Sequence, residues 1–87
     1  MSKDKILEIV KKFYDDEVKE HQTYINHLRN YDNRPKYEIA TVEERVTKYT
    51  IQRCLGVAFF VQKLDVPFEE IDELYNKTVE RIEETAK

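Results

Sequence analysis

The N-terminal third of the chain repeats hydrophobic positions at spacings of three and four residues, the pattern of an amphipathic α-helix. Ser2 or Asp4 can cap the start of this helix, because a short polar side chain there accepts a hydrogen bond from a free backbone N–H. The turn-forming segment 30–35 ends it, since Pro35 disfavours a helical conformation at the residue before it. The pattern predicts a helix over residues 3–29.

Two further helices are predicted downstream. Thr41 and Glu44 stand three residues apart, as in a capping box, in which each side chain accepts a hydrogen bond from the backbone N–H of the other. This predicts a second helix over residues 42–64. Pro67 is favoured at a first helical position, and the narrow apolar stripe after it predicts a third helix over residues 67–84.

These patterns predict an all-α fold, a three-helix bundle with a long N-terminal helix and a C-terminal helical hairpin. The second and third helices are expected to run antiparallel, with the first packed against both. Residues 1–87 are expected to form a single helical domain, because the chain contains no internal repeat, low-complexity tract or long linker.

The second predicted helix carries apolar residues on two sides. Counted at about 100° per residue, Ile51, Leu55 and Phe59 lie nearly opposite a longer stripe. That stripe consists of Val42, Val46, Tyr49, Arg53, Val57, Phe60 and Leu64. A helix that is apolar on both sides is expected to be buried on both sides, which predicts Ile51, Leu55 and Phe59 as contacts of a homodimer or of another partner. Gly56 is expected to allow close helix packing.

Composition and charge restrict the function. The formal net charge is −3, and the acids are concentrated after Pro67. Affinity for nucleic acid depends on concentrated positive charge, so a nucleic-acid partner is not expected. The single Cys54 cannot form an intramolecular disulfide, and the longest apolar run, 54–61, is too short to span a bilayer. We therefore expect a cytoplasmic protein with no membrane segment.

The junction of the second and third helices has apolar spacing similar to that of a helix-turn-helix. Val61 and Asp65 stand where that motif usually has a small residue and a Gly, so both turn positions depart from it. The helix that would read DNA presents acids, which phosphates repel; these are Glu69, Glu70, Asp72 and Glu73. A structural turn is the favoured interpretation, and a DNA-binding regulator is the alternative function.

Glu17, His21 and Arg53 are candidates for a buried polar cluster. Arg53 lies on an apolar stripe, where a guanidinium needs a carboxylate or another anion unless its head reaches water. Glu17, a bound anion and a partner chain are the alternative partners. His21 is four residues from Glu17 on one helix face and is expected to bond Glu17 or a neighbour. His27 lies about 240° around the helix from His21, so no metal site is expected.

The segment 30–40 combines aromatic and basic residues. Tyr31, Arg34 and Tyr37 form a candidate exposed contact surface, unless the Tyr side chains fold over the end of the bundle. The chain has no Ser-His-Asp or Cys-His pattern and no Gly-rich phosphate loop, so neither catalysis nor a cofactor is expected.

The segment 53–62 together with the segment 66–75 resembles the C-terminal half of small uncharacterised helical proteins from phages and mobile elements of low-GC Gram-positive bacteria. The resemblance implies a helical fold and an origin of that kind, with no activity to carry over. The sequence as a whole thus predicts a non-catalytic protein–protein interaction module or accessory factor, whose partner is a second copy or an unknown protein.

Overall fold

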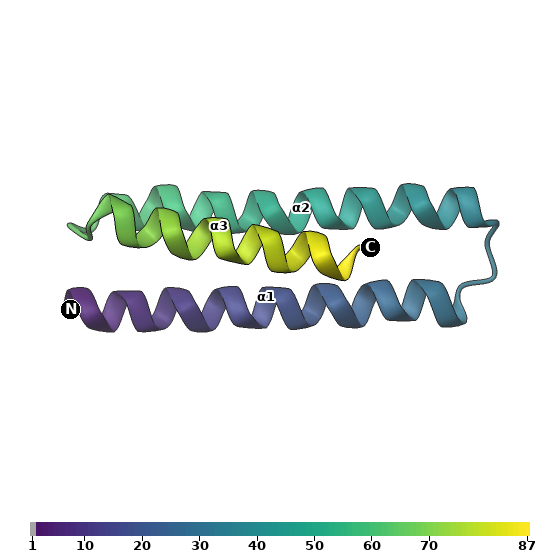
Figure 1. The fold of residues 1–87 in the computed structure, drawn as a ribbon, viewed down its shortest axis with the longest axis horizontal. Coiled ribbons are helices and arrows are strands. Elements are labelled where there is room, and N and C mark those ends of the chain that lie inside the picture. The colour runs from purple at the N-terminus through teal and green to yellow at the C-terminus, as the bar shows by residue number, and fades with distance from the viewer. Residues whose placement is uncertain (1) are drawn as a thin grey trace.

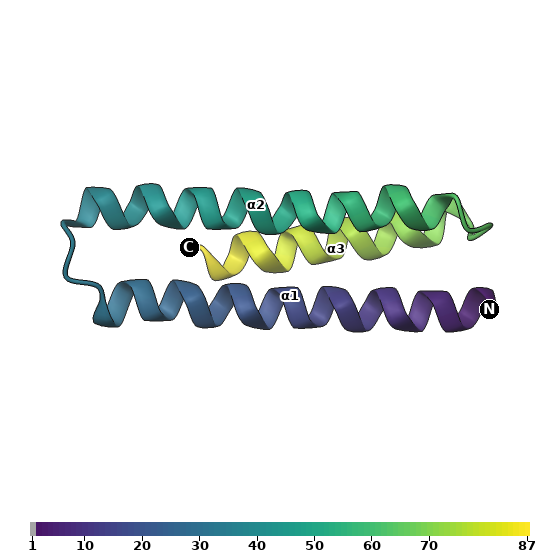
Figure 2. The same ribbon diagram turned by 180° about the vertical axis from the view of Figure 1, so that it is seen from behind.

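A computed structural model describes residues 2–87, and over that range the chain forms three α-helices without strands. Helix α1 spans Lys3–Tyr31, α2 spans Lys36–Gln62 and α3 spans Phe68–Thr85. The three helices lie side by side in a rod of 48 × 16 × 16 Å (Figure 1). The predicted all-α three-helix bundle is confirmed, with α2 and α3 as an antiparallel hairpin and α1 packed along both (Figure 2).

Helix α1 begins as its sequence predicts. The Ser2 hydroxyl accepts a hydrogen bond from the backbone N–H of Lys5 at 3.2 Å and so satisfies one of the free donors of the first turn. The helix ends at Tyr31, slightly beyond the predicted end at residue 29. Asp32 then turns the chain, and its carboxylate accepts a hydrogen bond from the backbone N–H of Arg34.

The predicted start of the second helix is wrong. Helix α2 begins at Lys36 rather than at residue 42, and the carbonyl of Pro35 accepts its first hydrogen bonds. Thr41 lies inside the helix and donates to the carbonyl of Tyr37, so the capping box does not form. Proline already holds φ at −56°, which suits the residue that precedes a helix, and this local preference outweighed the capping pattern downstream.

A tight turn joins α2 to α3. Asp65 adopts a left-handed backbone with φ of 60°, a conformation that Asp tolerates better than most residues. Pro67 precedes α3 instead of forming its first residue, and Val66 between them is buried. The chain therefore reverses direction at low backbone cost and brings α3 back along α2.

The core lies where the three helices meet. On α2 the buried line consists of small or medium side chains, namely Thr50, Cys54, Ala58 and Val61. This line runs between the two apolar stripes predicted for the helix, about 100° from the middle of each. The cluster contains Val10, Tyr14, Val18, Cys54, Ala58, Val61, Val66, Ile71 and Ile82.

The prediction that α2 is buried on both sides is wrong for a single chain. Ile51 packs against the core and Leu55 is half-buried, but Phe59 is 57% exposed. On the longer stripe Tyr49 and Phe60 are also more than half exposed. Two partner helices cover only one sector of α2, and apolar residues at its edges stay in contact with water.

Gly56 does not serve close packing. It is exposed, and a Cβ at this position would meet no heavy atom within 4 Å. The expectation of a close helix approach at this residue is therefore wrong, because Gly56 lies on the outer surface of α2.

The open space at Gly56 predicts a stabilising substitution. Gly56→Ala should raise the free energy of unfolding by about 1 kcal/mol, because Ala has the higher helix propensity and no atom stands in its way. Thermal or urea unfolding followed by circular dichroism measures the change. A destabilised variant would contradict the placement of Gly56 on an open helix surface.

Candidate interaction site

Glu17 of α1 and Arg53 of α2 form a two-pronged ion pair. The guanidinium Nε and Nη2 atoms donate to the two carboxylate oxygens at 2.8 and 3.1 Å. Glu17 has a side chain only 8% exposed, whereas that of Arg53 is 55% exposed. Of the alternatives left open by the sequence, the structure pairs Arg53 with Glu17 and also leaves much of its head near water. The buried carboxylate is satisfied, which a lone charge in this position would not be.

His21 does not bond Glu17 but joins all three helices. Its Nδ1 lies 2.5 Å from the hydroxyl of Thr85 on α3, and its Nε2 lies 2.8 Å from the hydroxyl of Thr47 on α2. Thr85 already donates its only proton to the carbonyl of Ile82, so it must accept from a protonated Nδ1. Nε2 of the neutral ring then accepts from Thr47. Both ring nitrogens of a neutral His21 therefore have hydrogen-bond partners.

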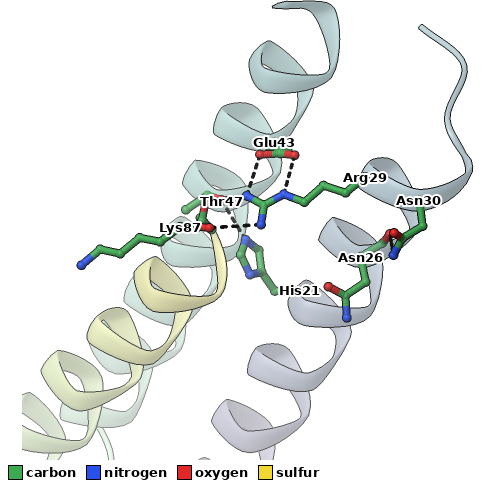
Figure 3. Close-up of polar contacts among 8 residues, drawn as sticks. His21, Asn26, Arg29, Asn30, Glu43, Thr47 and Lys87 are labelled. Carbon is green, nitrogen blue, oxygen red and sulfur yellow. Dashed lines mark hydrogen bonds and ion pairs between the residues drawn. The ribbon is translucent and has the colours of Figure 1, made fainter. Parts of the chain in front are cut away.

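Arg29 closes the same end of the bundle, a role that the sequence analysis missed (Figure 3). Its Nε and Nη2 donate to the carboxylate of Glu43 at 2.9 and 3.0 Å. The same guanidinium donates to the carbonyls of Ala86 and Lys87. Arg29 thus ties the end of α3 to α1 and α2, and its positive charge suits the free carbonyls of a helix C-terminus.

The protonation states in this region favour structure over acid–base chemistry. Burial first, and then the charge of Arg53, lower the pKa of His21, although Glu43 opposes them in part. Burial raises the pKa of the Cys54 thiol to about 11, so the nucleophilic thiolate is strongly disfavoured. Buried side-chain nitrogens and oxygens of residues 2–87 all have hydrogen-bond partners. Within the same residues, no group of three His, Cys, Asp or Glu side chains is placed to hold a metal ion.

The residues predicted as a contact surface in the first connection do not converge. Tyr31 and Tyr37 are both more than 70% exposed and do not fold over the bundle end. Tyr31 stacks loosely on His27, with ring centroids 5.4 Å apart. Arg34 pairs with Asp32 at 2.6 Å, and this hydrogen bonding lowers the pKa of Asp32 to about 2. At this end of the bundle the exposed aromatic rings do not form one surface, and the charge of Arg34 in the turn is neutralised by Asp32.

The α2–α3 junction differs from a helix-turn-helix in its geometry. The helices of that motif cross at a large angle, so that the second helix is free to enter a groove of DNA. Here α3 runs back along α2 and α1 (Figure 1), and its buried residues Ile71, Thr78 and Ile82 face them. The acids of its first turns point to solvent.

An open apolar groove between α1 and α2 is a surface feature that the sequence analysis did not identify. It has a volume of about 250 Å³ and is lined entirely by hydrophobic side chains. These are Ile6, Ile9, Val10 and Phe13 from α1, and Val57, Phe60, Val61 and Leu64 from α2. Both sets are spaced i, i+3, i+4, i+7, so each forms a continuous stripe on its helix.

Much of the groove lining is exposed to water. Phe60 is 64% exposed, Ile9 49% and Leu64 43%. Phe59, the neighbour of Phe60, is exposed to a similar extent but does not line the groove. The i, i+3, i+4, i+7 spacing of each stripe is visible in the sequence. That the two stripes face each other across a groove follows only from the antiparallel packing of α1 and α2 at this level.

Searches against models of protein families, curated proteins and solved structures found no match. In the part of the chain that the structure describes, no helix has the length and apolar character needed to cross a lipid bilayer.

The neutral His21 predicts loss of stability in mild acid. Because the folded state lowers the pKa of His21, the unfolded chain binds more protons as the pH falls below about 6.5. The contribution of neutral His21 to the free energy of unfolding is complete above this pH. It declines as the pH falls toward the lower pKa that His21 has in the folded state. Urea unfolding between about pH 7.5 and pH 5 measures the decline.

His21→Gln provides the control, because Gln retains hydrogen bonding but does not titrate. This variant should be less stable at pH 7 and should show a smaller change over the same interval. An equal pH dependence in both proteins would refute a neutral, buried His21.

Cys54 predicts a thiol that is protected while the protein is folded. Alkylation by iodoacetamide at pH 8 should be more than about a hundredfold slower in the folded protein than in the urea-denatured chain, since both burial and the raised pKa suppress the thiolate. Mass spectrometry measures the rate. Rapid labelling of the native protein would show that Cys54 is not in the core.

Proposed function

We propose that this protein is a non-catalytic protein-interaction module whose docking surface is the α1–α2 groove. One observation carries the proposal. An entirely apolar concavity lies open between two helices of a chain whose other exposed surface is mostly charged. Leaving such a surface in water costs free energy that a complementary apolar partner recovers, at about 25 cal/mol per Å² buried.

The spacing of the groove residues supports a helical occupant. Two stripes with the i, i+3, i+4, i+7 pattern flank the space where another helix would lie in a larger bundle. An amphipathic helix fills such a space with its own apolar stripe, which is a common mode of recognition. Phe60 and Ile9 supply the large exposed side chains that usually dominate binding energy in a contact of this kind.

The alternative of a DNA-binding regulator has weaker support. The helix that would enter DNA is packed along α1 and α2, and its exposed face is acidic. Binding driven by phosphates would also weaken steeply with added salt. A shift assay on DNA with salt titration separates this role from apolar docking.

Site-specific photo-crosslinking in the cells that make the protein tests the proposal. A photoreactive phenylalanine analogue is placed at position 60 in one variant and at position 59 in another. The two positions are adjacent and similarly exposed, but only residue 60 lines the groove. We expect position 60 to capture a polypeptide and position 59 to capture much less.

Addition of a second substitution, Ile9→Asp, should abolish capture at position 60, because a charge in the groove cannot be desolvated at low cost. Circular dichroism of each variant controls for folding. Absence of any captured polypeptide at position 60, or equal capture at both positions, would refute docking in the groove.

A further inference from the structure

We propose that the partner at the groove is a second copy of this chain, which covers the groove with its own α1–α2 surface, and not with a single inserted helix, about a twofold axis parallel to the helices. The inference rests on the proposed docking function and names its partner. In this dimer α1 of one copy lies on α2 of the other, and the four helices form an antiparallel bundle with α3 on each outer side.

The register of α1 against α2 shows which residues lie at one level along the rod. Glu17 bonds Arg53, His21 bonds Thr47 and Arg29 bonds Glu43. Moving along α1 toward its C-terminus therefore corresponds to moving along α2 toward its N-terminus, and a step of twelve residues on α1, from 17 to 29, corresponds to a step of ten on α2, from 53 to 43. Rotation about a twofold axis parallel to the rod does not change the position of a residue along the rod. Each residue of α1 therefore meets, on α2 of the partner, the same residue that it lies beside on α2 of its own chain.

The exposed apolar residues follow one surface along this pair of helices. Near the α2–α3 turn, Ile9, Phe60 and Leu64 border the groove. Beyond the Glu17–Arg53 pair, Tyr24 and Tyr49 lie on the same sides of α1 and α2 by the 100° rule, and both are about half exposed. Apposition of two copies places groove against groove and Tyr24 near the partner's Tyr49. A single short helix from another protein would cover only one of these ends.

Charge at the middle of the surface selects both the partner and its orientation. On α1, Glu20 is exposed on the same side as the groove residues, whereas the neighbouring Asp16 is paired with Lys12 at 3.7 Å. On α2 the side chain of Arg53, which Glu17 of its own chain already binds, is 55% exposed at the same level. An axis parallel to the helices sets Glu20 of α1 opposite the exposed part of Arg53 of the partner. An axis across the helices would instead set α1 against α1, with acid facing acid. Only the first arrangement is electrostatically complementary.

Sedimentation equilibrium of the purified full chain over a wide concentration range tests the dimer. We expect reversible dimerisation, with a Kd that Phe60→Ser raises by more than about tenfold, because each dimer loses two large aromatic contacts. Phe59→Ser, at the adjacent exposed position outside the groove, should change the Kd by less than about threefold. Circular dichroism controls for folding.

A charge reversal tests the orientation. Glu20→Lys should raise the dimer Kd by about tenfold at low salt, because it sets a cation against Arg53 of the partner. Glu8→Lys makes the same charge change about 120° around α1, on the side next to α3, and should have little effect. If the axis instead ran across the helices, Glu20→Lys would relieve acid–acid repulsion and tighten the dimer.

The remaining outcomes separate the two proposals. A monomer at all accessible concentrations, combined with photo-crosslinking of a different polypeptide at position 60, would overturn the self-partner and leave the docking function standing. A dimer weakened by Phe59→Ser and not by Phe60→Ser would overturn both the groove as docking surface and the proposed axis, and would favour the Ile51, Leu55 and Phe59 stripe. A dimer tightened by Glu20→Lys would overturn the proposed axis alone.

Discussion

The fold depends on a narrow line of small side chains along α2. Thr50, Cys54, Ala58 and Val61 face the junction of α1 and α3 and are almost completely buried. Small residues allow neighbouring helices to approach closely, and larger side chains from α1 and α3 then fill the space, with Tyr14, Ile71 and Ile82 fully covered. The same geometry leaves the bulky residues of α2 at its edges, outside the region that two partner helices can enclose. Close packing at the centre and exposed aromatics at the edges are thus two consequences of one arrangement.

Polar contacts fix the register of this packing. Apolar stripes alone permit helices to slide past one another, since many neighbouring positions offer similar burial. The Tyr14 hydroxyl donates to the carbonyl of Cys54, Glu17 holds Arg53, and His21 bonds both Thr47 and Thr85. Displacement by one turn would leave these buried groups without partners, and an unsatisfied buried polar group costs about 1–3 kcal/mol. Arg29 adds a matching constraint at the end of α3, where the α1–α2 pair continues alone and still buries Ile25 and Leu28.

The sequence predicted the helices more accurately than it predicted the contacts between them. The periodic spacing in α1 and the single stripe in α3 predicted both elements to within two residues at each end, because their buried residues occupy one face. The start of α2 was missed because a capping pattern at Thr41 competed with Pro35, and local sequence does not rank the two. For the polar cluster, residue spacing placed Glu17 and His21 on one face, but it could not show that His21 bonds residues 26 and 64 positions away.

By itself the sequence determined that the chain forms three helices, where α1 ends, where α2 turns into α3 and which residues prefer burial, because these features depend on neighbours within a few positions. Only the tertiary structure decided which apolar residues of α2 lie in the core and which remain at the surface. That outcome depends on the directions from which α1 and α3 approach. The groove exists for the same reason: Ile9 and Phe60 are far apart in the chain, and only antiparallel packing at one level brings their stripes to opposite walls of one concavity.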